Sequence, residues 1–140
     1  MTSNGPPDPA APRAVVAGHG EFAAGMISAV QLISGKGGAF RGLSNFGLDA
    51  DGLLAAMEAA ITAHAAHVVF TDLPAGSCTF AARRLARSRP GLTVVTGANL
   101  SMLLEYALRG DGGAGGAERA AERGRAAIAV TLAPEGGRAD

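Results

Sequence analysis

The chain has 140 residues, its 12 basic and 12 acidic side chains cancel, and Cys78 is its only cysteine. This length suits one domain with a buried core, and a lone cysteine excludes an internal disulfide and fits a reducing compartment. The balanced charge argues against nucleic-acid binding, and no apolar stretch is long enough to span a membrane.

The first residues, 1–12, have the sequence MTSNGPPDPAAP, which is polar and rich in proline. Because this stretch lacks the apolar centre of a signal peptide, we expect a disordered lead. The folded domain is expected to span residues 13–132, and residues 133–140 are expected to form a flexible tail.

Short apolar runs along the chain predict strands that are buried on both faces, as in a parallel sheet. They are RAVVA (13–17), HVVFT (67–71) and LTVVT (92–96). A weaker segment, residues 39–43, is expected to be a strand because the chain needs a crossover there.

Helical patterns separate these strands. The first contains Phe22, Met26, Val30 and Ile33 and can close at Gly35. The others are expected to begin at a cap on Asp49 or Asp51, at Ser77 or Thr79 (ending near Arg89), and at a cap on Asn99.

The C-terminal part of the sequence departs from this alternation. GDGGAGG (110–116) predicts a flexible loop, and a charged helix is expected over residues 117–125. The following run, AIAVTL (127–132), is too short for another strand and helix. It could lie on a sheet edge of this chain or of a partner.

The order of elements predicts an α/β fold with right-handed crossovers. We expect an open, mainly parallel sheet of four strands in the order 2-1-3-4, flanked by helices. In such sheets, ligands bind beyond the carboxyl ends of the strands, at the point where the strand order reverses.

Two polar residues follow neighbouring strands at this end. His19 follows residues 13–17, and Asp72 follows residues 67–71. If these two strands pair, one imidazole nitrogen can donate to the carboxylate, which fixes the tautomer and leaves the other nitrogen as a nucleophile or base.

The segment PAGS, which follows Asp72 by one residue, leads into a helix. The N–H groups of a helix start bind anions, Gly76 permits close approach of the backbone, and the Ser77 hydroxyl adds a donor. Ser77 could equally serve as a helix cap. An oriented imidazole that faces an anion cradle is suited to phosphoryl transfer.

Other patterns give weaker hypotheses. Gly18, Gly20 and Ala23 fit a dinucleotide fingerprint, but residues 37–46 lack the acidic residue that such a site requires. Cys78 at a helix start could be a reactive thiol, although a buried apolar role is more common. His64 and His67 lack a third metal ligand. We therefore expect no metal ion and no cofactor.

Three motifs in order carry a resemblance to a known family: VVAGHGEFAAGMISAVQLISG, VVFTDLPAGSCTFAARRL and VVTGANLSMLLE. Together they resemble the enzyme IIA component of the mannose-family sugar phosphotransferase system (PTS), over about residues 13–109. The resemblance implies a cytoplasmic relay in which His19 accepts phosphate from the phosphocarrier protein HPr. A IIB component then takes the phosphate and phosphorylates the sugar at the membrane permease.

The resemblance also implies residue roles. Asp72 would orient His19, and Gly76 and Ser77 would belong to the phosphate-binding loop. The family forms homodimers in which the C-terminal strand crosses to the partner's sheet. Residues 127–132 would be that strand. The loop itself departs from the family pattern, because Pro74 and Ala75 precede Gly76 and Cys78 replaces a proline. An alternative is a regulatory sensor of phosphorylation, without sugar transport.

Overall fold

The computed structural model describes residues 12–109 and 113–135. Its centre is a four-stranded sheet with the order β2-β1-β3-β4, in which every neighbouring pair is parallel. This confirms the predicted order and direction. The strands are β1 (Ala14–Gly18), β2 (Phe40–Ser44), β3 (Val68–Thr71) and β4 (Thr93–Val95).

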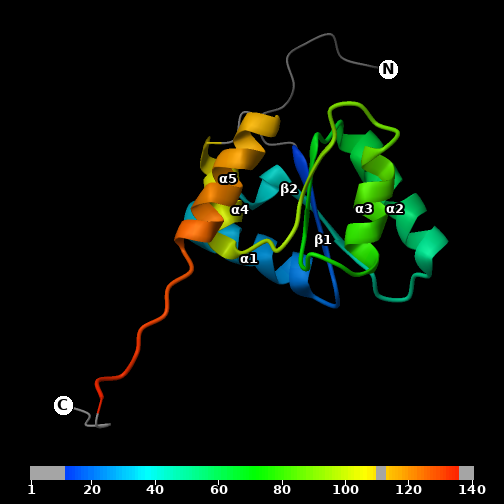
Figure 1. The fold of residues 1–140 in the computed structure, drawn as a ribbon. Helices are drawn as coiled ribbons and strands as arrows, with labels where there is room; N and C mark the ends of the chain where they lie inside the picture. Colours follow the sequence, from blue (N-terminus) through cyan, green and yellow to red (C-terminus); the bar gives the residue numbers. More distant parts are fainter. Residues whose placement is uncertain (1–11, 110–112, 136–140) are drawn as a thin grey trace.

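Helices cover both faces of the sheet (Figure 1). On one face lie α2 (Ala50–His64) and α3 (Ser77–Ala86). On the other lie α1 (Phe22–Ser34), α4 (Leu100–Arg109) and α5 (Ala114–Ala126), and a short 3₁₀ turn, η1 (Gly37–Ala39), leads into β2.

The two faces of the sheet contribute to two separate cores. Successive side chains of a strand alternate between its faces, so Val16 and Phe70 pack with α1 and α4, whereas Val15 and Val69 pack with α2 and α3. All five residues of β1 are buried. This double burial explains why the strands are continuous apolar runs rather than alternating ones.

The helix caps follow the sequence closely. The Asp49 carboxylate accepts a hydrogen bond from Gly52 N at 2.7 Å, and the Asn99 side-chain oxygen accepts one from Met102 N at 3.0 Å. Gly35 ends α1 in a left-handed conformation, with φ 71°. These three boundaries are therefore confirmed.

Other boundaries were only partly right. Helix α3 begins at Ser77, one of the two expected starts, with Gly76 as its cap, but it ends at Ala86, earlier than expected. Helix α5 begins at Ala114, so Gly116 is helical rather than part of a loop. Gly116 is buried in that helix, and tertiary packing overrides the low helix propensity of glycine there.

The expected C-terminal strand is not paired in the single chain. After α5 the backbone leaves the domain as an extended segment (Figure 1), and no strand is formed over residues 127–132. The side chains of Ile128, Val130 and Leu132 are 73%, 81% and 82% exposed. Most of the predicted lead (1–12) and tail (133–140) lies outside the described residues.

Candidate functional site

The register of the sheet places His19 beside Asp72. Ala17 of β1 is paired with Thr71 of β3, and parallel strands end at the same edge of a sheet. The residues that leave this edge, His19 and Asp72, therefore meet as expected from the sequence.

Two hydrogen bonds join the pair. The His19 ring nitrogen Nδ1 lies 2.7 Å from Asp72 Oδ2, and the His19 backbone N–H donates to the same oxygen at 2.9 Å. An ionised carboxylate only accepts hydrogen bonds, so Nδ1 carries the proton and the neutral ring has its free lone pair on Nε2. The His19 side chain is 47% exposed, so Nε2 lies on a ring that a partner can reach.

The carboxylate is held in its charged form. Burial works to raise the pKa of Asp72, but the hydrogen bonds from the His19 ring and backbone, with the electrostatic attraction of that side chain, outweigh burial and lower it below its usual value of 3.8. The Asp72 side chain is 10% exposed. At neutral pH it is therefore a fixed negative charge that orients the imidazole.

The turn around His19 is tightly packed. A Cβ atom at Gly18 would lie 2.6 Å from the Phe22 ring and 3.1 Å from the carboxyl carbon of Asp72, so only glycine fits. The amide oxygen of Asn45, which follows β2, accepts a hydrogen bond from Gly20 N at 3.3 Å. Asn45 was not predicted from the sequence, although its place just after a strand was an available signal.

The other side of the imidazole faces the start of α3. Gly76 has φ 116°, and a Cβ atom built there would lie 3.4 Å from His19 Cε1 and 4.0 Å from Nε2. No side chain caps this helix, and the first N–H groups of a helix have no partner within the helix. The predicted juxtaposition of His19, Asp72, Gly76 and the exposed Ser77 is therefore present in the fold.

Cys78 is buried beneath this loop and is not a reactive thiol. Burial raises the pKa of Cys78 to about 11, and the negative charge of Asp72 acts in the same direction. The thiol is protonated at neutral pH, which fits the apolar role expected for it.

Two threonines near Asp72 were also missed. Thr71 and Thr79 are buried, and their hydroxyl oxygens lie 2.7 Å apart. Their sequence signal was ambiguous, because a threonine at a strand end and one in a first helical turn are each common.

No group of three potential metal ligands is present in residues 12–109 and 113–135. Over the same part of the chain, none of the helices has the length and apolarity that a membrane span requires.

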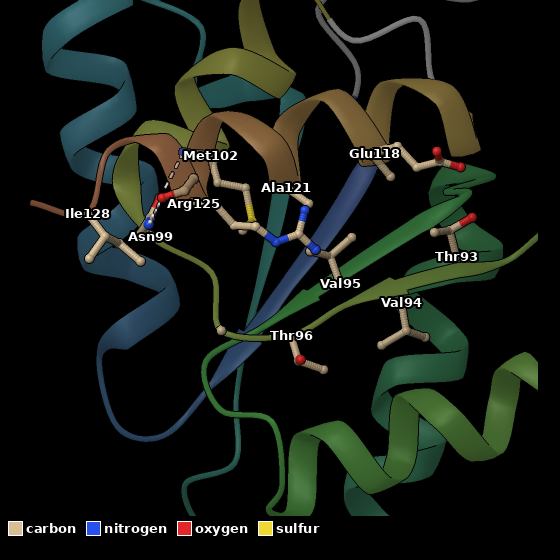
Figure 2. Close-up of a pocket in the computed structure, with 13 residues that line it drawn as sticks. Thr93, Val94, Val95, Thr96, Asn99, Met102, Glu118, Ala121, Arg125 and Ile128 are labelled. Carbon is tan, nitrogen blue, oxygen red and sulfur yellow. Dashed lines mark hydrogen bonds between the residues drawn. The ribbon is translucent and has the colours of Figure 1, made fainter.

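A hollow lies away from His19, between β4 and α5 (Figure 2). Strand β4 is at the edge of the sheet and pairs only with β3. Val95 and Thr96 line the hollow on the strand side, Ala121 and Arg125 line it on the helix side, and Ile128 lies at its end.

Comparisons with known proteins agree with this fold. Residues 13–119 match the family described as the PTS system fructose IIA component, a model named EIIA-man. No curated protein matches the chain at a significant level.

Solved structures extend the likeness. A mannose/sorbose-specific IIA subunit from Enterococcus faecalis is 24% identical with a TM-score of 0.74, and the match covers 89% of this chain and 98% of that one. An EIIA component from Streptococcus agalactiae is 21% identical (TM-score 0.75, covering 84% and 95%). A IIA protein associated with the fucose utilization operon of Streptococcus pneumoniae is 20% identical (0.74, covering 86% and 93%).

At these identities the structures establish a shared fold, and the family match covers most of the chain. The protein therefore belongs to the mannose-type IIA components of the sugar phosphotransferase system.

Proposed function

We propose that this protein is a cytoplasmic phosphohistidine carrier that accepts a phosphoryl group from HPr on His19 Nε2 and passes it to a IIB component. The observation that carries the proposal is the 2.7 Å contact between His19 Nδ1 and Asp72, which leaves Nε2 as the nucleophilic nitrogen in front of the α3 start.

The chemistry needs little beyond positioning and charge stabilisation. The Nε2 lone pair forms a bond to phosphorus while the bond between phosphorus and its donor atom on HPr breaks, and the donor keeps that electron pair. The positive charge that develops on the imidazole lies beside Asp72, and the phosphoryl oxygens lie against the N–H groups after Gly76. In the second step the bond between Nε2 and phosphorus breaks as a nucleophile on IIB attacks, and Nε2 keeps that electron pair.

The test is a labelling assay with enzyme I, HPr and labelled phosphoenolpyruvate. We expect acid-labile phosphate on the wild type and none on His19→Ala. Asp72→Ala should slow uptake about 10- to 100-fold, because the ring is no longer held in its productive orientation.

The two other histidines of the chain provide the control. His64→Ala and His67→Ala should be labelled like the wild type, since neither residue touches the site. Full labelling of His19→Ala would exclude the proposal. Adding a IIB protein separates the two roles open to a carrier, because transport requires onward transfer and a purely regulatory sensor does not.

We also propose that the protein is a homodimer in which residues 128–132 of each copy add to the β4 edge of the other. The alternation of Ile128, Val130 and Leu132 puts three apolar side chains on one face of an extended strand, and these side chains are exposed in the single chain. The hollow between β4 and α5 borders the unpaired edge that such a strand would complete (Figure 2). Strand exchange would cover the exposed apolar side chains and pair the open edge of β4 at the same time.

A further inference from the structure

Thr71 and Thr79 are the two polar residues that the protein buries within residues 12–109 and 113–135, at 0% and 1% exposure. Thr71 is the last residue of β3, and Thr79 lies in the first turn of α3. The loop between them contains both Asp72 and Gly76. A buried hydroxyl is costly unless it is hydrogen-bonded, so the partners of these two groups indicate what they do.

The hydroxyl protons can be placed by counting. Thr79 Oγ1 lies 2.5 Å from the Leu73 carbonyl oxygen and 2.7 Å from Thr71 Oγ1, whereas Thr71 Oγ1 is 3.4 Å from that carbonyl. A hydroxyl has one proton to donate. Thr79 therefore donates to Leu73, and Thr71 donates to Thr79, in a chain that ends on the backbone of the loop.

This chain holds the loop where packing does not. Leu73, Pro74 and Ala75 are exposed, so no core surrounds the backbone between Asp72 and Gly76. The Leu73 carbonyl is tied to α3 through Thr79, and the Thr71 carbonyl accepts a hydrogen bond from Ala98 N at 2.9 Å. Asp72 is thus anchored through the residues on both sides of it.

We infer that Thr79, supported by Thr71, is a positioning residue for phosphoryl transfer: it fixes the Asp72 carboxylate and the start of α3 as one rigid unit on either side of the His19 ring. The inference rests on the proposed function for its catalytic consequence. The orientation of the ring, however, can be measured without any transfer.

The experiment compares Thr79→Val, which keeps the shape and removes the donor, with Thr79→Ser, which restores it. Nitrogen NMR of the neutral His19 ring reports which nitrogen carries the proton. We expect the wild type and Thr79→Ser to hold it on Nδ1, and Thr79→Val to show a mixture of both tautomers. Labelling by HPr should fall about 10-fold or more in Thr79→Val and return in Thr79→Ser.

Two further variants make the result decisive. Thr71→Val keeps the bond from Thr79 to Leu73, so its effect should be smaller than that of Thr79→Val. Ile61→Ala is the control for stability alone, because this buried residue of α2 lies away from the loop. It should lower the unfolding midpoint and leave the His19 tautomer unchanged.

The outcomes separate this inference from the proposed function. An unchanged tautomer in Thr79→Val, or the same tautomer mixture in Ile61→Ala, would overturn the positioning role. An effect of Thr71→Val that equals or exceeds that of Thr79→Val would overturn the assigned direction of the hydrogen bonds. Absence of labelling in the wild type would instead remove the proposed function and leave the tautomer test standing.

Discussion

Gly76 lies between the His19 ring and the start of α3, and its backbone conformation excludes other residues. Its φ of 116° and ψ of 173° lie in a region that is essentially restricted to glycine. Gly76→Ala should strain the backbone by about 1–3 kcal/mol and place a methyl group 4.0 Å from Nε2, where the phosphoryl group is proposed to attach. We expect labelling by HPr to fall at least about 10-fold.

Gly91 provides a matched control for that variant. It also has a positive φ, 85°, and nothing lies within 4 Å of a Cβ atom built there. Thermal unfolding should show that Gly91→Ala is destabilised to a similar degree as Gly76→Ala. Gly91→Ala should nevertheless be labelled at the wild-type rate. Equal labelling of the two variants would show that Gly76 has a structural role only.

At the residue scale, the site residues that can be predicted from the sequence are polar residues that directly follow a strand. His19 and Asp72 follow apolar runs directly, so their meeting required only the correct strand pairing. Thr71 and Thr79 could not be found in this way, because their role depends on one backbone carbonyl, that of Leu73, whose position is set by the folded loop. Local sequence does not encode such a tertiary contact.

Among the elements, α5 depends on a close approach to α4. A Cβ atom at Gly124 would lie 2.9 Å from Met102 Cε, 3.1 Å from Met102 Cβ and 3.2 Å from Asn99 Oδ1. The amide of Asn99 also donates to the Gly124 carbonyl at 3.0 Å. Gly124→Ala should therefore push the helices apart and lower the free energy of unfolding by about 1–3 kcal/mol.

The same helix contains a glycine whose replacement by alanine is expected to stabilise the protein. The nearest atom to a Cβ built at Gly115 is Arg119 Nη1 at 3.7 Å, an ordinary contact. Gly115→Ala should raise the free energy of unfolding by about 0.5 kcal/mol, since alanine loses less backbone entropy in a helix. Urea denaturation of both variants measures the pair, and destabilisation by Gly115→Ala would contradict this account of α5.

The element boundaries that the sequence predicts well are those with a side-chain cap. The side-chain oxygens of Asp49 and Asn99 each accept a hydrogen bond at the start of one helix, and both residues were identified as candidate caps. The starts of α3 and α5 have glycine caps without a side-chain hydrogen bond, at Gly76 and Gly113. A glycine is compatible with a turn, a loop or a helix start, so the sequence left Ser77 and Thr79 as alternative starts of α3 and placed the start of α5 at residue 117 instead of Ala114.

For the whole molecule, the proposed strand exchange makes a prediction about association. In size-exclusion chromatography with light scattering, the wild type should have the mass of a dimer. Val130→Lys should be a monomer, because it puts a charge on the face that is proposed to enter the partner's hollow. Thr131→Lys is the matched control, since residue 131 points to the opposite face of an extended strand and should leave the dimer intact. A monomeric wild type, or equal behaviour of the two variants, would exclude the exchange.

The overall topology was predictable because three apolar runs, a weaker fourth segment and the crossovers between them leave few arrangements. Strand order 2-1-3-4 follows from pairing β1 with both β2 and β3. The place of residues 127–132 was not fixed in this way, since an isolated run of six residues fits an edge of either copy.

The central place of β1 also affects how the protein is made. This strand is synthesised first, yet one of its two neighbours, β3, ends at Thr71. At roughly 5–20 residues per second, about 3–10 s of translation separate them. Both sides of this apolar strand are open until β2 is made, and one side stays open until β3 is made, so we expect the nascent chain to be prone to aggregation during this interval.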